Sequence, residues 1–316
     1  MLLTRRQIRE KVMKTLYAYY QGAHTEVSSA EKELLHSISK VYEVFIYYMK
    51  LLPELKHFAE QYVIERKNKR LPSQEDLDPS LNFVNNTILL ALSESSELHE
   101  ITSKMKIGWD DQPDLIKKIY FSFKDESFFK KYLAKEKLDF EDERTMLVEL
   151  VERFIVPNEA IINLFEERSL YWLDEIELMQ QHFLKFIIDM KEPRLKKIKI
   201  PTLHKFKEED LEFATKLFRR TLLSDKEYLA IIALKTDNWE IERVAKMDII
   251  LMQMAICELL QFPSIPIKVS LDEYIEISKE YSSPQSKIFI NGILDKLVTD
   301  FKRDNKIQKA GRGLIE

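Results

Sequence analysis

The sequence predicts an all-α protein, and three observations support this fold class. Only five glycines and ten prolines occur among 316 residues, so the chain has few turns and long regular elements. Apolar residues recur at helical spacing along most of the chain. No segment sustains the alternation of apolar and polar residues that a half-buried strand requires. With 45% hydrophobic residues, the chain can bury a sizeable core between packed helices.

Helical patterns follow one another along the whole chain. Thr4 is the expected N-cap of the first helix, and Gly22 its expected stop. Pro53 is expected to interrupt the second pattern, because proline removes a backbone donor. The segment 71–80 has loop composition, and the segment 191–206, with its prolines and spaced basic residues, is expected to be an extended connector. The expected helices cover approximately residues 4–21, 28–51, 54–70, 80–106, 113–136, 140–155, 157–191, 207–222, 225–236, 239–262, 269–281 and 284–303.

Charge is distributed unevenly along the chain. The net charge is −4, which alone argues against extensive nucleic-acid binding. Residues 1–21, however, contain five basic residues and one acidic residue, and residues 302–316 contain five basic and two acidic residues. Two basic segments on an acidic body indicate local contacts with a polyanion. The alternative, that both segments are simply solvated, stays open at this point.

Residue types that carry catalysis or bind metals form no recognisable site in the sequence. No P-loop, GxGxxG, HExxH or CxxC motif occurs, and the six histidines lack the spacing of metal ligands. The single cysteine, Cys257, lies in an apolar stretch and is expected to be a small buried hydrophobe. We therefore expect no enzyme, no metal and no cofactor.

The same features bear on the compartment. One cysteine excludes an internal disulfide and is typical of a reducing environment. The N-terminal residues lack the apolar run of a signal peptide, and no stretch reaches the ~18 apolar residues of a membrane span. A cytoplasmic protein without a membrane partner is the expectation.

The first helix is amphipathic but changes character towards its start. Its apolar stripe consists of Ile8, Val12, Leu16 and Tyr19, and Arg5 and Arg9 lie close to the same azimuth, with Arg6 beside it. Burying arginines without partners would be very costly, so we expect the helix to present them at the edge of its core. A planar guanidinium suits phosphates. Intramolecular salt bridges to the acidic body are the alternative.

The last helix contains an Asn291-Gly292 pair that would ordinarily signal a turn. A break there would destroy the phase of the core stripe, so the pair is expected to lie inside a continuous helix. The predicted core stripe consists of Ile290, Ile293, Leu294, Leu297, Val298 and Phe301. Gly292 lies off this stripe, beside Phe289, and leaves a notch. Two occupants stay open: the backbone of another helix, or a nucleotide that stacks on Phe289.

Several segments together resemble one known family. They are "RRQIREKVMKTLYAYYQ" (5–21), "NWEIERVAKMDIILMQMAICELL" (238–260), "IPIKVSLDEYIEISKEY" (265–281) and "SKIFINGILDKL" (286–297). In order and spacing they are similar to the first helix and the C-terminal half of the NusB transcription antitermination family. The resemblance implies two small three-helix bundles packed together. It also implies binding of boxA-type single-stranded RNA from ribosomal-RNA transcripts, as a heterodimer with a small ribosomal protein in the NusE role, within the RNA polymerase antitermination complex.

The resemblance also implies roles for individual residues. The expected RNA contacts are Arg5, Arg6, Arg9, Gln285, Ser286 and Phe289. The expected contacts with the ribosomal protein are Tyr17, Glu242 and Asp248. The sequence departs from the family at Gln7, which interrupts the basic run, and at Cys257, where an aromatic residue is usual.

The largest departure is a long segment that the resemblance does not cover. We expect residues 1–21 and 205–303 to form the NusB-like bundle and residues 304–316 to form a basic flexible tail. Residues 22–204 would be a helical insert, either an added domain or a decayed copy of the bundle.

The function predicted from these observations is that of an RNA-binding antitermination factor. One alternative is a helical scaffold that binds only protein. The other is an accessory RNA-binding subunit of an RNA methyltransferase.

Overall fold

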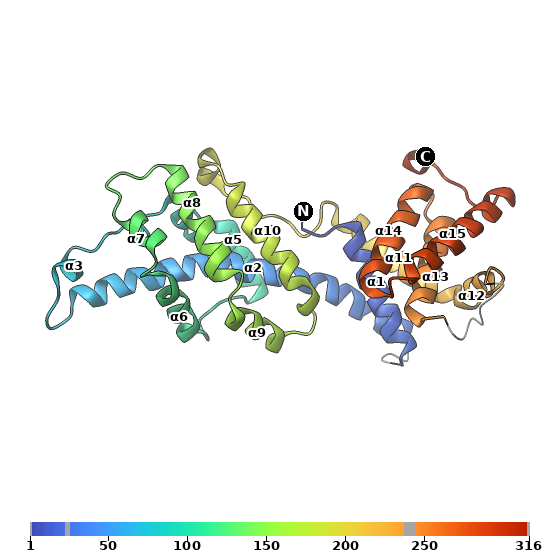
Figure 1. The fold of residues 1–316 in the computed structure, drawn as a ribbon, viewed down its shortest axis with the longest axis horizontal. Coiled ribbons are helices and arrows are strands. Elements are labelled where there is room, and N and C mark those ends of the chain that lie inside the picture. Colours follow the sequence, from blue (N-terminus) through green and yellow to red (C-terminus); the bar gives the residue numbers. More distant parts are fainter. Residues whose placement is uncertain (1, 23–25, 237–243, 315–316) are drawn as a thin grey trace. The chain divides into compact units, whose positions relative to one another are not determined.

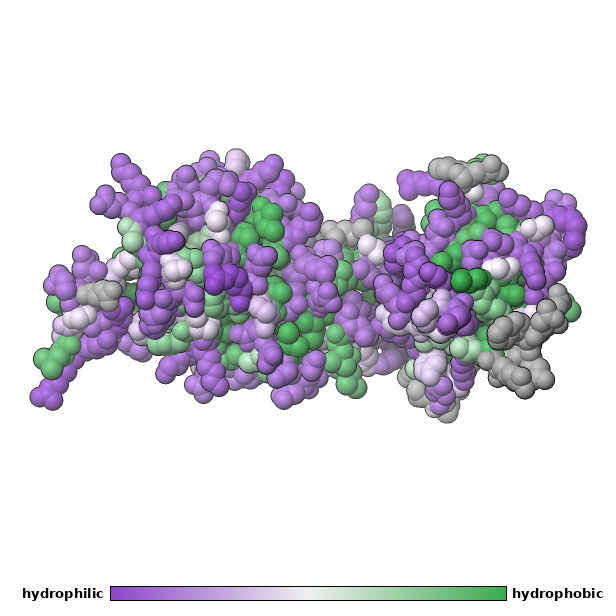
Figure 2. Space-filling model, viewed as in Figure 1, coloured by the Kyte–Doolittle hydropathy of each residue, from purple (hydrophilic) through white to green (hydrophobic). Residues whose placement is uncertain are grey.

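The computed structural model describes residues 2–22, 26–236 and 244–314, and within these ranges the regular elements are all helices. The all-α prediction is confirmed. The chain divides into two compact units. The first comprises Leu3–Ile38 and the residues from His204 on, and the second comprises Ser39–Leu203 with Leu2. In Figure 2, hydrophilic residues cover most of the visible face of each unit.

Among its described residues, the first unit contains six α-helices and the start of a seventh. Its helices are α1 (Arg5–Tyr20), α11 (Lys207–Leu223), α12 (Asp225–Ala233), α13 (Lys246–Gln261), α14 (Ile267–Tyr281) and α15 (Ser286–Arg303), joined by the first residues of α2 (Val27–Lys67). Helices α1, α11 and α13 contact one another, as do α13, α14 and α15, so the two three-helix sets share α13 (Figure 1).

Helix α13 is the centre of the first unit because it is apolar around most of its circumference. Ile250, Leu251, Met252 and Met254 follow one another around the helix, and all are at most 1% exposed. A helix that is apolar around most of its circumference is buried among other helices. Helix α15 instead buries one stripe, and the predicted core positions are buried except Val298, which is half-buried.

The second unit is also helical. It contains the rest of α2 and α3 (Gln74–Leu77), α4 (Thr87–Ser93), α5 (Ser96–Met105), α6 (Pro113–Phe123), α7 (Ser127–Leu133), α8 (Phe140–Leu150), a π-helix (Val151–Ile155), α9 (Glu159–Arg168) and α10 (Ile176–Ile188). Its core is rich in aromatic rings. The ring centroids of Tyr48 and Phe183 are 5.5 Å apart, and the Trp109 indole donates to the carbonyl of Tyr47 over 3.1 Å.

Helix α2 continues through Pro53, so the predicted interruption is wrong. Proline costs an interior helix about 3 kcal/mol through the lost hydrogen bond and its ring clash. Beside it, Leu51, Leu52 and Leu55 are completely buried. Burying a leucine side chain is worth ~1.5–3 kcal/mol, so packing of this face outweighs the local cost.

Residues 304–316 were predicted to form a flexible tail, but the described part of this segment, up to Leu314, is held against the first unit. The Ala310 amide donates to the carbonyl of Pro263 over 3.0 Å, and the Lys309 ammonium donates to the carbonyl of Phe262 over 3.0 Å. A short 3₁₀ helix, Gly311–Leu314, follows. These bonds hold the segment against the turn between α13 and α14.

Candidate nucleic-acid interface

A capping box fixes the start of α1. The Thr4 hydroxyl accepts a hydrogen bond from the Gln7 amide, and the Gln7 side-chain oxygen accepts one from the Thr4 amide over 2.6 Å. The predicted N-cap is confirmed, and Gln7, which interrupts the basic run, is the residue that completes the cap. The first turn, with Arg5 and Arg6, is therefore held in one orientation.

Arg9 is buried, with 2% of its surface exposed, and its guanidinium forms a two-pronged pair with Glu258 in α13. The Glu258 carboxylate also accepts hydrogen bonds from Ser270 over 2.7 Å and from Tyr274 over 3.1 Å. Burial alone would lower the pKa of Arg9, but the charge and hydrogen bonds of Glu258 outweigh burial and raise it. The prediction that Arg9 lies exposed as an RNA contact is wrong, since Arg9 ties α1 to α13.

Arg6 and Arg5 remain accessible although both have acidic partners. Two nitrogens of Arg6 lie 3.0 Å from the carboxylate oxygens of Glu273 in α14, and 41% of its side chain is exposed. This hydrogen bond raises the pKa of Arg6. Arg5 pairs with Asp210 over 2.9 Å, with 38% of its side chain exposed. Both guanidinium groups thus lie half in solvent at the start of α1.

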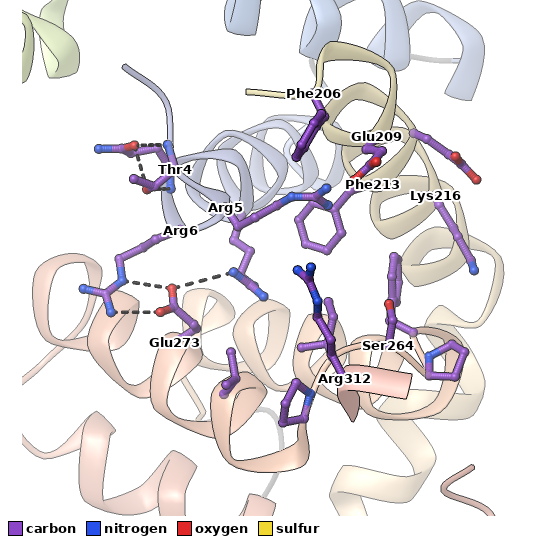
Figure 3. Close-up of a pocket in the computed structure, with 18 residues that line it drawn as sticks. Thr4, Arg5, Arg6, Phe206, Glu209, Phe213, Lys216, Ser264, Glu273 and Arg312 are labelled. Atoms are coloured by element: carbon purple, nitrogen blue, oxygen red, sulfur yellow. Dashed lines mark hydrogen bonds and ion pairs between the residues drawn. The ribbon is translucent and has the colours of Figure 1, made fainter. Parts of the chain in front are cut away.

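A groove of about 1410 Å³ opens beside these arginines (Figure 3). Arg5 lies over the ring of Phe213, with its guanidinium carbon 4.4 Å from the ring centroid. Lys216 and Arg312 line the same groove. Phe213 and Lys216 were not predicted as site residues, because nothing in the pattern of the α11 segment distinguishes a groove wall from a core stripe.

The first turn of α13 and the turn between α14 and α15 form a buried polar network. Ser282 donates to the Asp248 carboxylate, and its hydroxyl lies 2.9 Å from that of Ser286. Asp248 and Ser286 are each 5% exposed. Both residues are therefore inaccessible in this structure, where they hold helix ends together inside the fold, and their roles as a protein contact and an RNA contact stay predictions.

The exposed start of α15 carries the other predicted RNA residues. Gln285 is exposed at the N-cap position, and Phe289 is half-buried one turn later. Gly292 is exposed, and a Cβ atom built there would meet no atom within 4 Å. The notch beside Phe289 is therefore open, and the alternative in which it admits another helix backbone is wrong.

Helix α1 links the two groups of predicted RNA residues. The Lys14 ammonium lies 4.9 Å from the ring centroid of Tyr281, at the end of α14. Arg6 pairs with Glu273 two turns earlier on the same helix. The α1–α14 edge therefore leads from the arginine pair to the turn before Gln285.

The residues predicted to face a protein partner are not brought together. Tyr17 is 37% exposed on α1. Asp248 is buried, as described above, and Glu242 lies outside the described residues. Tyr17 is thus the one member of this set that the structure describes as exposed.

The side chains that could ligate a metal, and the single thiol, do not gather at one site in the described part of the chain. No three side chains of His, Cys, Asp or Glu come together there as a metal site would require. Burial raises the pKa of the Cys257 thiol to about 12. Among the described helices, none is long and apolar enough to cross a membrane.

The fold and the site define the class of this protein. It is an all-α bundle protein with half-exposed arginines at the start of one helix. The chain belongs to the NusB family. The model of this family matches residues 167–299. The match begins inside the segment 22–204, so it extends further towards the N-terminus than the predicted resemblance. It does not include α1, and the likeness of α1 to the family's first helix stays a prediction.

Three relatives carry the name transcription antitermination protein NusB. The protein of Salinibacter ruber is 48% identical over 104 residues, which are 33% of this chain and 65% of the relative. That of Chloroherpeton thalassium is 39% identical over 105 residues, 33% of this chain and 50% of the relative. That of Listeria monocytogenes is 36% identical over 95 residues, 30% of this chain and 74% of the relative.

The similarity to these relatives covers only part of each chain. For the first two relatives, the chain spans between half and two thirds of their length. No solved structure matches the chain significantly.

Proposed function

We propose that this chain is an RNA-binding adaptor in transcription antitermination. It binds boxA-type single-stranded RNA of ribosomal-RNA transcripts, together with a small ribosomal protein, as part of an RNA polymerase antitermination complex. The observation that carries the proposal is the half-exposed Arg5–Arg6 pair, held by the capping box at the start of α1 in a member of the NusB family.

Arg6 is suited to an additional anionic ligand. A guanidinium has five N–H donors, and Glu273 occupies two of them. The remaining donors can reach a phosphate, and the pairing with Glu273 restricts the side chain before RNA arrives. Such pre-ordering reduces the entropy lost on binding.

Phe289 and Gln285 supply the second part of the proposed RNA surface. A base can stack on a half-buried ring, and a glutamine amide can hydrogen-bond to a base edge or a phosphate. The open notch at Gly292 leaves room for the stacked base. Ser286 and Arg9 are buried beneath this surface and hold together the helices that form it.

Binding measurements with matched RNAs test the proposal. A labelled boxA-type oligoribonucleotide and its scrambled counterpart are titrated with the full chain in the presence of the ribosomal protein. We expect tighter binding of the boxA-type RNA and an affinity that falls with salt, because phosphates are neutralised. Equal binding of the two RNAs would contradict the proposal.

One observation favours a second candidate, a helical scaffold that binds only protein. Arg5, Arg6 and Arg9 all have carboxylate partners inside the first unit. The double variant Arg5→Ala/Arg6→Ala separates the candidates. Loss of RNA binding with retained binding of the ribosomal protein supports the adaptor, and unchanged RNA binding supports the scaffold.

A further inference from the structure

We propose that the groove beside α1 is a subsite for one further nucleotide of the bound RNA, completed by the segment 304–314. This inference rests on the RNA-binding function proposed above. The subsite has an aromatic rim at Phe206 and a basic wall formed by Lys216 and Arg312 (Figure 3). The family match ends at residue 299, so the segment that carries Arg312 lies outside the matched region.

The segment carrying Arg312 is built tightly against the turn that closes the groove. Gly313 is buried, and a Cβ atom there would lie 1.9 Å from the carbonyl oxygen of Pro263. Only glycine permits this close approach. Gly311 adopts a φ of +56°, which also favours glycine. The two glycines on either side of Arg312 therefore set its position at the groove.

Aromatic rings form the apolar side of the groove. Phe213 and Phe262 pack against each other with ring centroids 5.3 Å apart and are nearly buried. Phe206, in contrast, is 54% exposed at the rim. An exposed ring at the edge of a groove offers a stacking face, and stacking on aromatic side chains accepts any of the four bases.

The cationic side chains of the basic wall can pair with a phosphate. Within the part of the chain that the structure describes, neither Arg312 nor Lys216 forms an ion pair, and Lys216 lies over the Phe262 ring at 4.8 Å. Glu209 and Glu212 also line the groove. These carboxylates disfavour a run of phosphates but can accept hydrogen bonds from a base amino group. The combination fits a single nucleotide, with its base near Phe206 and one phosphate at Arg312.

Lengthening the RNA one nucleotide at a time tests the subsite. The full chain is titrated with a labelled boxA-type oligoribonucleotide and with versions extended by one nucleotide at either end. In the unmodified chain, we expect one of the two extensions to strengthen binding about ten-fold, as one stacked base does. The variants Phe206→Ala and Arg312→Ala should lose this gain, and both residues are exposed, so the fold is not at risk.

Arg220→Ala is the matched control, because Arg220 is an exposed arginine one turn beyond Lys216 and does not line the groove. A 4-thiouridine at the added position should crosslink to the peptide that contains Phe206 or to the segment 304–314. Retention of the gain in both variants, or crosslinks only to other parts of the chain, would overturn the subsite while leaving the adaptor function intact.

Two other results would also contradict the nucleotide subsite. If the variants weaken binding of the ribosomal protein but keep the gain from the longer RNA, the groove holds a protein segment and the inference is wrong. If the unmodified chain binds none of these RNAs, both the adaptor function and the nucleotide subsite are wrong.

Discussion

The guanidinium of Arg9 and the carboxylate of Glu258 form a buried pair, with Nε and Nη2 each 2.8 Å from a carboxylate oxygen. Removing one partner of such a pair leaves an uncompensated buried charge and typically costs ~3–5 kcal/mol. We expect Arg9→Ala to lower the stability of the first unit by this amount. Hydrogen exchange of the α13 amides measures the loss.

Arg6→Ala is the control for this prediction, because Arg6 is half-exposed and its loss should cost at most ~1 kcal/mol. If Arg9→Ala left exchange in α13 unchanged and abolished RNA binding, Arg9 would be an RNA contact after all.

Helix wheels predicted which positions of α1 and α15 face a core, but not which residue of another helix meets them. Arg9 lies near the apolar stripe of α1, and its burial depends on Glu258, which is distant in sequence. The same holds for Ser286 and Asp248, which three helix ends bring together through Ser282. Local patterns contain no information on such pairings, whereas the N-cap role of Thr4 was predictable from its residue type and its place before the first helix.

The family resemblance and the structure also differ in the exposure that they give to the three arginines of α1. A family motif marks Arg5, Arg6 and Arg9 alike, but the helix turns Arg9 inward and leaves the other two half-exposed. Arg312 was not predicted as a site residue, because the basic composition of residues 304–316 predicted a flexible tail. Its position depends on Gly313 packing against Pro263, a contact between segments that no local pattern reveals.

Gly292 should tolerate an alanine and gain from it. The residue is exposed inside α15, and an added Cβ atom would meet nothing within 4 Å. Alanine is favoured over glycine in a helix interior by ~0.8–1 kcal/mol, so Gly292→Ala should raise the melting temperature. A bulky residue such as leucine also has a higher helix propensity than glycine, but its side chain fills the notch.

Gly292→Leu should therefore weaken RNA binding without lowering stability. Thermal unfolding and RNA titration are measured on both variants. A lower melting temperature for Gly292→Leu would show that the notch serves packing, in conflict with the structure.

The thiol of Cys257 should be inert in the folded chain. Burial raises its pKa to about 12, and the thiolate is the reactive form. A free thiol has a pKa of about 8.5, so its protonation contributes stability below that pH, which is lost as the pH rises towards 12. At pH 8 we expect a thiol reagent to modify the chain slowly in buffer and rapidly in denaturant. The chain has one cysteine, so the signal has one source. Fast labelling under native conditions would contradict the burial of α13.

Asp248 and Tyr17 should affect binding of the ribosomal protein in different ways. Asp248 is 5% exposed and accepts a hydrogen bond from the half-buried Ser282, so Asp248→Ala removes a hydrogen bond between two helix ends. Losing a hydrogen bond to a carboxylate costs ~1.5–3 kcal/mol, and we expect a lower melting temperature with only a secondary effect on the partner. Tyr17 is 37% exposed, and an exposed tyrosine suits the centre of an interface.

Tyr17→Ala should therefore weaken binding of the ribosomal protein by ten-fold or more, as truncation of an interface anchor does, while the melting temperature stays close to that of the unmodified chain. Calorimetric titration with the ribosomal protein and thermal unfolding of both variants give the two readouts. Tyr19→Ala on the same helix is the matched control, because Tyr19 is less exposed and packs against Tyr20 with ring centroids 6.1 Å apart. If Asp248→Ala abolished partner binding at unchanged stability, the carboxylate would belong to the interface, and the structure would have to open at Ser282 to present it.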